Sequence, residues 1–312
     1  MNDAPSVPFV HSALFHGDED EYLAGTVPFV QGALAAGEPV AVAVPGEHLR
    51  LVRDALGADA DLVRFFDMGE VGRNPGRILP GVLHAFADAQ PPDRRVRIVA
   101  ESVWPGRTAA EYPACVQLEA LVNAAFRDRG MTVLCPYDTA RLDSRAVADA
   151  HATHPMYRSP GSPEPHTSAA YGPEAVFARY NRPLPPAPSV AFAFDAGSLS
   201  TARHLATGEA ARLGLTGTRL HDLALITAEL TTNSVVHGGG SGTLWVWAEG
   251  EYVVCEVADK GHLADPLAGR RPATRDQRGG RGLLLVNLVA DLVRVHTGTA
   301  GTTIRCLLRL GS

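Results

Sequence analysis

Three polar residues at helical spacing carry the clearest chemical signal in the sequence. Glu229, Asn233 and His237 stand at positions i, i+4 and i+8 of the segment AELTTNSVVHG, so a helix would place them on one face. An asparagine carbonyl is a hard oxygen ligand suited to Mg²⁺, and a glutamate one turn away can accept a proton. The same stripe could be an ordinary solvated helix face that ends in a glycine cap at Gly238. The stripe alone leaves both interpretations open.

Two glycine-containing segments downstream favour the chemical interpretation. A predicted strand leads directly into Asp259, whose carboxylate could accept a hydrogen bond from an exocyclic amine, and Gly261 would let a flat ring approach closely. The run Arg278–Gly282 precedes a predicted helix over 283–290, and a flexible loop that opens onto a helix N-terminus is an anion site. Arg281 could add a forked contact to a phosphate. A glycine run alone is weak evidence, but these signals in this order indicate a nucleotide site.

The elements that must position these residues are predicted from periodicity and turn signals. In order they are helices over 198–213 and 218–237, strands over 243–248 and 252–258 joined by a hairpin signal at 249–251, a helix from about 282, and a strand pair within 292–310. Helices on one face of a mostly antiparallel sheet form an α+β layer, which is the architecture we expect for the C-terminal part.

Residues 198–310 resemble the GHKL (Bergerat) ATPase fold shared by gyrase B, Hsp90, histidine kinases and MutL, and specifically the anti-sigma factor serine kinases. The matching positions are Glu229, Asn233 and His237 in the N box, Asp259 and Gly261 in the first glycine box, Gly279, Gly280, Arg281 and Gly282 in the second, and Gly301, Thr302 and Thr303 near the end. One departure is that a second glycine often seen after the first box is replaced in the run 259–263.

The resemblance implies a domain that binds ATP and Mg²⁺. It implies that Asn233 holds Mg²⁺ and that Glu229 acts as general base. It also implies that Asp259 reads adenine N6, that Thr303 supports the adenine, and that a lid over roughly 262–282 closes on the phosphates. The implied reaction is phosphoryl transfer to a serine or threonine of an anti-sigma antagonist of the STAS type. The alternative is a non-catalytic, ATP-dependent binding switch for a sigma factor or antagonist; intact Glu229 favours the enzyme.

Composition excludes other ways of handling a nucleotide. Lys260 is the only lysine, so neither a Walker P-loop nor a protein kinase of the common eukaryotic type can be built. The formal charge of −6, without a dense basic run, argues against a direct nucleic-acid partner. With no signal-peptide pattern and no apolar stretch long enough to span a bilayer, we expect a cytoplasmic protein. The cysteines lie far apart without a CxxC pair and are predicted to be reduced and mostly buried.

The first half of the chain alternates short β-rich runs with stretches of helical period, which is typical of a parallel sheet covered on both faces. The expected strands are 13–15, 39–44, 62–66, 96–100 and 132–135, with helices over 19–36, 48–56, 75–89 and 109–129. Nine prolines between Pro155 and Pro188 predict an extended connection, within which 174–180 could form a short helix. The predicted organisation is a domain over 9–155, a linker over 156–189 and a domain over 190–312.

Residues 9–155 resemble MEDS, a sensory domain known from methanogen and methylotroph regulators such as DcmR. The supporting residues are His11, the run ESVWPGR at 101–107, Glu119 and the run CPYD at 135–138. The resemblance implies small-molecule sensing. Ligands of open sheets sit beyond the carboxyl ends of the strands, so the candidate ligand residues are Glu101, Trp104, Arg107, Tyr137 and Asp138, together with His11. Taken singly, Trp104 and Tyr137 could instead be packing residues, and Arg107 could be a surface ion pair.

Two other classes of protein are disfavoured. A histidine kinase would need an upstream helical hairpin with a phosphoacceptor histidine, and His151, His154 and His166 lack such periodic surroundings. A metabolic enzyme on the N-terminal sheet would be expected to carry a glycine-rich first turn, but the chain after Phe15 reads only His-Gly-Asp. The expected partners are therefore an anti-sigma antagonist or sigma factor and a small-molecule signal, and a homodimer is left open.

Overall fold

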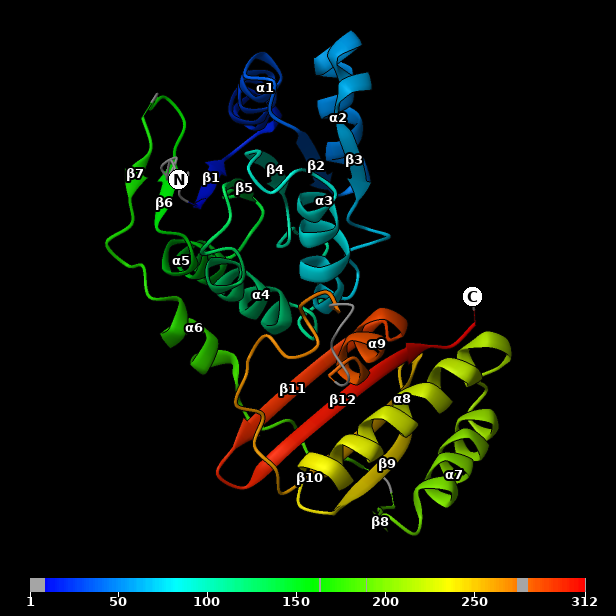
Figure 1. The fold of residues 1–312 in the computed structure, drawn as a ribbon. Helices are drawn as coiled ribbons and strands as arrows, with labels where there is room; N and C mark the ends of the chain where they lie inside the picture. Colours follow the sequence, from blue (N-terminus) through cyan, green and yellow to red (C-terminus); the bar gives the residue numbers. More distant parts are fainter. Residues whose placement is uncertain (1–8, 163, 189, 274–279, 312) are drawn as a thin grey trace. The chain divides into compact units, whose positions relative to one another are not determined.

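The computed structural model describes residues 9–162, 164–188, 190–273 and 280–311 (Figure 1). The chain divides into two compact units, Met1–Tyr180 and Asn181–Ser312. No helix in the described part of the chain has the length and the apolar content that crossing a lipid bilayer requires.

The first unit is built on a sheet with the strand order β3-β2-β4-β5-β1-β6-β7. Its neighbouring strands are parallel except for β7, which runs antiparallel to β6. The strands are β1 (Val10–His16), β2 (Val40–Val44), β3 (Arg64–Asp67), β4 (Val96–Ala100), β5 (Met131–Asp138), β6 (Met156–Arg158) and β7 (His166–Thr167). All five residues of β2, Val-Ala-Val-Ala-Val, are buried, as expected for a parallel strand covered on both faces. The predicted α/β class is confirmed for this unit.

Helices cover both faces of this sheet, with α1 and α2 on one side and α3, α4 and α5 on the other (Figure 1). They are α1 (Glu19–Ala35), α2 (Gly46–Leu56), η1 (Gly57–Leu62), η2 (Pro75–Arg77), η3 (Leu79–His84), α3 (Ala85–Asp88), α4 (Tyr112–Ala125), α5 (Ser144–Thr153) and α6 (Pro173–Tyr180). Helix α1 begins after Asp18, whose carboxylate accepts a hydrogen bond from the Glu21 amide at 2.9 Å. The stretch predicted as one helix over 75–89 is instead a short 3₁₀ turn, a π-helical turn and a single α-turn.

The proline-rich segment is more ordered than its composition predicts. Strand β6 pairs with β1, and α6 packs on the first unit, where the Tyr180 hydroxyl donates to Asp149. The next residue, Asn181, already belongs to the second unit and exchanges two hydrogen bonds with the Thr297 backbone, at 2.8 and 3.1 Å. Further on, the Pro185 carbonyl accepts a hydrogen bond from Arg305 at 2.5 Å. The segment predicted as a linker over 156–189 is thus divided between the two units.

The second unit has an antiparallel sheet with the strand order β11-β12-β10-β9-β8. Helices α7, α8 and α9 lie on one face of it (Figure 1). The elements are β8 (Phe192–Asp195), α7 (Leu199–Arg212), α8 (Gly217–His237), β9 (Ser241–Glu249), β10 (Tyr252–Asp259), α9 (Gly282–Val289), β11 (Leu292–Gly298) and β12 (Gly301–Arg309). The predicted α+β layer is confirmed; β8, which pairs with β9, was not predicted.

The core of this unit lies between α8 and the sheet. Leu223, Ile226 and Leu230 on α8 are buried at i, i+3 and i+7, and they join Val257 and Leu308 from the strands in one apolar cluster. The polar stripe of α8 is therefore positioned by burial of the adjoining apolar stripe.

Replacing Leu223 by alanine is expected to lower the free energy of unfolding by about 2–5 kcal/mol, because it leaves a cavity beneath α8. The matched control is Leu205→Ala on α7, where the leucine is 49% exposed and the loss should stay within about 0.5 kcal/mol. Denaturant unfolding of both variants checks this. Equal losses would contradict the burial assigned to α8.

Candidate functional site

The polar stripe of α8 meets the first residue of α9. A Cβ atom built on Gly282 would lie 2.5 Å from Glu229 Oε2 and 3.3 Å from Asn233 Nδ2, so both side chains approach the α9 N-terminus closely. Glu229 and Asn233 are partly buried, and His237 at the end of α8 is exposed. A helix N-terminus, a carboxylate and a carboxamide are thereby brought together. This combination can hold an anion together with a hard cation.

Asp259 ends β10 with its carboxylate fixed in place. Ser234 Oγ donates to Asp259 Oδ2 at 2.6 Å, and the Gly261 amide donates to Oδ1 at 2.8 Å. A Cβ on Gly238 would lie 2.4 Å from Asp259 Cγ, so the end of α8 packs directly on the carboxylate. Because a carboxylate has about four lone-pair positions, Asp259 can still accept a hydrogen bond from an exocyclic amine. Ser234, one residue after Asn233, was not predicted as part of the site.

Two threonine hydroxyls tie the chain after β10 to the β11–β12 hairpin. Thr302 Oγ1 donates to the Gly261 carbonyl at 2.9 Å and lies 2.9 Å from Thr297 Oγ1. Thr297 Oγ1 in turn accepts a hydrogen bond from the Leu263 amide at 3.0 Å. These contacts hold the first residues of the predicted lid.

Thr303 was predicted to support the adenine, but strand geometry places Thr302, and not Thr303, at the cavity. Thr302 stands opposite Asp259 in the β10–β12 register and lines the cavity, whereas Thr303 is one residue further along. Successive side chains of a strand point to opposite faces, so Thr303 projects from the face away from α9. Ile304, two residues after Thr302, lies on the cavity side again.

A cavity of about 330 Å³ opens among these elements. Its lining residues are Asn233, His237, Gly238, Asp259, Gly261, His262, Leu263, Ala268, Gly269, Gly280, Gly282, Leu283, Thr302 and Ile304. Six predicted site residues are in this set; Glu229, Arg281 and Thr303 are outside it, and Gly279 lies outside the described residues. The apolar members Leu263, Leu283 and Ile304 give the cavity walls suited to a flat ring.

The residues predicted to sense a ligand are distributed over several places in the first unit. His11 and Tyr137 point into the interior, where the Tyr137 ring lies edge-on to His154. Arg107 stacks on Trp104 at 3.6 Å and donates from all three of its nitrogens to backbone carbonyls. Asp138 accepts from the amides of residues 140 and 141 at the end of β5. Arg107 and Asp138 therefore organise loops.

Glu101 follows β4 at its carboxyl end and is hydrogen-bonded to a histidine. His48 Nδ1 lies 2.7 Å from Glu101 Oε2, and the His48 ring stacks on Tyr22 at 4.3 Å. Burial raises the pKa of Glu101 above its ordinary value. At His48, burial lowers the pKa, but the hydrogen bond and negative charge of Glu101 outweigh it, and the pKa is raised. His48 and Tyr22 were not predicted to accompany Glu101.

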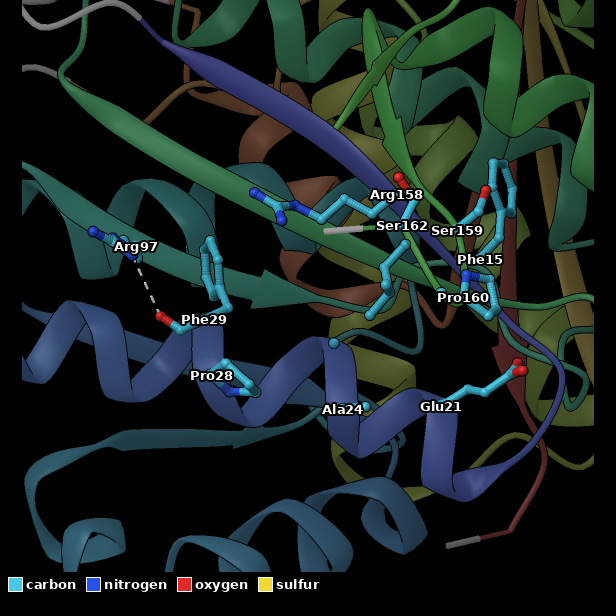
Figure 2. A pocket seen from close by; sticks show the side chains of 13 residues that line it. Phe15, Glu21, Ala24, Pro28, Phe29, Arg97, Arg158, Ser159, Pro160 and Ser162 are labelled. Carbon is cyan, nitrogen blue, oxygen red and sulfur yellow. Dashed lines mark hydrogen bonds between the residues drawn. The ribbon is translucent and has the colours of Figure 1, made fainter. Parts of the chain in front are cut away.

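A second cavity, of about 510 Å³, lies between α1, β4 and the segment after β6 (Figure 2). Pro28 and Phe29 of α1 form an apolar side, Arg97 donates to the Phe29 carbonyl at 3.5 Å, and Arg158 extends across the opening. Serines 159 and 162 add hydroxyls at its other end (Figure 2). Arg97 and Arg158 give this cavity two cationic side chains. Sequence reasoning missed it because it treated residues after 155 as linker.

Comparisons with known proteins assign both units to families. Residues 10–155 match the family described as MEDS, the methanogen/methylotroph, DcmR sensory domain. Residues 192–307 match the histidine kinase-like ATPase domain. The chain is therefore a fusion of a MEDS sensory domain with a histidine kinase-like ATPase domain, and the predicted fusion of these two domains is confirmed.

Two similar solved structures come from bacteria. One contains the RsbU and RsbW domains of Rv1364c from Mycobacterium tuberculosis, with 19% identity over 39% of this chain and 32% of that chain and a TM-score of 0.30. The other is the Acinetobacter baumannii histidine kinase AdeS, with 11% identity over 39% of this chain and 68% of that chain and a TM-score of 0.25. The present chain thus spans about a third of the first structure. No curated protein matches the sequence.

Replacing Gly282 by alanine is expected to weaken ATP binding at least about tenfold, or roughly 1.4 kcal/mol, because the methyl group would enter the space between α9, Glu229 and Asn233. The nearest obstacle is the flexible end of a side chain, so the fold should persist. The control is Gly208→Ala on α7, where a Cβ meets nothing within 4 Å. That change should stabilise the helix by about 0.5–1 kcal/mol and leave ATP binding unchanged. Calorimetric titration with Mg-ATP measures both; equal affinities would contradict the site.

Proposed function

We propose that this chain is a regulatory serine/threonine kinase of the anti-sigma factor type, working in the cytoplasm. Its ATPase domain would phosphorylate a hydroxyl of an anti-sigma antagonist, under control of a ligand bound by the MEDS domain. The observation that carries the proposal is the meeting of Glu229 and Asn233 with the N-terminus of α9 at Gly282.

The chemistry of the donor set supports an Mg-ATP site. The Asn233 carboxamide, whose oxygen would be the hard ligand, lies beside the helix N-terminus, and the space at Gly282 would be closed by a single Cβ atom. Mg²⁺ bound there would offset the negative charge of the phosphates. The backbone amides at the start of α9 would bind phosphate oxygens, and Asp259 would accept a hydrogen bond from the adenine amine.

Glu229 is the residue proposed to take the proton of the attacking hydroxyl. Its carboxylate lies next to the α9 N-terminus, on the same helix face as Asn233 and one turn away. Two histidines of the first unit are poorly placed as phosphoacceptors, since His154 is fully buried and His166 lies on the two-residue strand β7. A hydroxyl on a separate protein is therefore the acceptor we propose.

One observation favours a second candidate function, an ATP-dependent binding switch without catalysis. Glu229 is not among the residues that line the cavity, although its neighbour Asn233 is. In such a switch, ATP bound in the cavity would set the affinity of the ATPase domain for a sigma factor or antagonist, and no phosphate would be transferred.

Two variants separate these functions. Asn233→Ala should remove Mg²⁺-dependent ATP affinity with little loss of stability, because Asn233 is only partly buried. Glu229→Gln should keep the affinity and reduce phosphoryl transfer by about 10²–10⁴-fold, because it removes the proton acceptor. Thermal shift with Mg-ATP reports binding, since a ligand selective for the native state stabilises it by mass action. Labelled ATP with STAS-type antagonist domains reports transfer.

The outcomes distinguish the two functions and can reject both. A rise in Tm with Mg-ATP, accompanied by label on the antagonist that Glu229→Gln abolishes, supports the kinase. Tight binding without transfer to any antagonist supports the switch. Unchanged affinity in Asn233→Ala would remove the metal role of that residue.

A further inference from the structure

Four side chains with metal-binding atoms meet inside the MEDS domain, away from the ATPase site. His11 lies on β1, Glu119 on α4 and Cys135 on β5, and His154 follows α5. Their ligand atoms all lie within 4.8 Å of one another, and none of the four residues is more than 2% exposed. The sequence indicated three of them as motif residues, and the fold adds His154.

The separations between these atoms suit a single small ion. His11 Nε2 lies 3.3 Å from both Glu119 Oε2 and Cys135 Sγ, and His154 Nε2 lies 3.5 Å from Glu119 Oε2. Cys135 Sγ is 3.7 Å from the same carboxylate oxygen. With bonds of about 2.0–2.1 Å to N and O and about 2.3 Å to S, a tetrahedral zinc site separates its ligand atoms by roughly 3.3–3.7 Å.

Outer hydrogen bonds orient both imidazoles toward the cluster. His11 Nδ1 is 3.2 Å from Asn123 Oδ1, and Asn123 is oriented by donating from Nδ2 to the Thr153 carbonyl at 2.8 Å. His154 Nδ1 donates to the Ala150 carbonyl at 2.8 Å. With Nδ1 of each ring engaged by its outer oxygen partner, Nε2 of each ring is left to face the cluster. Metal-binding histidines are held in this way by their other ring nitrogen.

The cluster contains electron-rich atoms that lack hydrogen-bond partners. Glu119 Oε1 and His154 Nε2 are buried without one in the part of the chain that the structure describes. A buried carboxylate beside two imidazole Nε2 atoms needs a cation.

We propose that His11, Glu119, Cys135 and His154 bind one Zn²⁺ with tetrahedral geometry. Two imidazoles, a thiolate and a carboxylate are a ligand set that suits zinc, and four protein ligands leave no open position, as in a structural site. Binding would release the Cys135 thiol proton to solvent as the sulfur becomes a ligand. The ion would fasten α4 and the end of α5 to β1 and β5, independently of ATP.

The test uses the full-length chain, stripped with a chelator and titrated with Zn²⁺ or Co²⁺ alone. The natural sequence should bind one ion per chain, and its cobalt form should show tetrahedral d–d bands with a thiolate-to-cobalt charge-transfer band. Cys135→Ser should lose that band and bind zinc at least about 100-fold more weakly. Cys115→Ser is the matched control, because Cys115 is a buried cysteine of the same unit outside the cluster.

Two further variants test the zinc site even if Cys135→Ser folds poorly. Asn123→Ala leaves all four ligands in place and should weaken zinc binding about 10–100-fold through loss of the outer hydrogen bond. Asn233→Ala, in the ATPase domain, should leave zinc stoichiometry unchanged. The inference is overturned if the natural chain binds neither ion, if its cobalt spectrum lacks the thiolate band, or if Cys115→Ser loses the band as fully as Cys135→Ser.

Discussion

The end of β10 is held between the end of α8 and the start of β12 at distances that exclude side chains. A Cβ on Gly301 would lie 1.9 Å from the Asp259 carbonyl oxygen, and one on Gly261 would lie 2.7 Å from Gly238 Cα. These obstacles are backbone atoms, so they cannot turn aside as a side chain would. This close packing fixes the orientation of Asp259 and the hydrogen bond that it accepts from Ser234. It also fixes the path of the chain as it leaves β10.

Local periodicity explains why much of the ATPase domain could be predicted. The N-box stripe follows from helical spacing alone, and Asp259 follows from a strand that ends at a glycine-containing turn. The choice between Thr302 and Thr303 depends on which face of β12 meets the helices. Alternation at Ile304, Cys306 and Leu308, which all pack in the core, would have indicated Thr302. The path of residues 262–282 has no periodicity from which to predict it.

Most strands of the MEDS domain could be predicted from the sequence, but the contacts of its polar side chains could be predicted less well. Apolar runs such as 40–44 and 96–100 identify the parallel strands. The pairing of β6 with β1 was missed because β6 lies in a proline-rich segment. His154 lies just before β6. Its contact with His11 arises from the tertiary fold, and no local pattern in the sequence predicts it. Arg107 looked like a ligand residue by type, but only the fold shows that backbone carbonyls occupy its donors.

The chain passes directly from the first unit to the second between residues 180 and 181. Tyr180 is hydrogen-bonded to Asp149 within the MEDS unit, and Asn181 is hydrogen-bonded to Thr297 within the ATPase unit, so a single peptide link joins two anchored residues. Thr297, the partner of Asn181, also holds Leu263 through its hydroxyl, so the first residue of the second unit and the border of the 330 Å³ cavity share one anchoring residue.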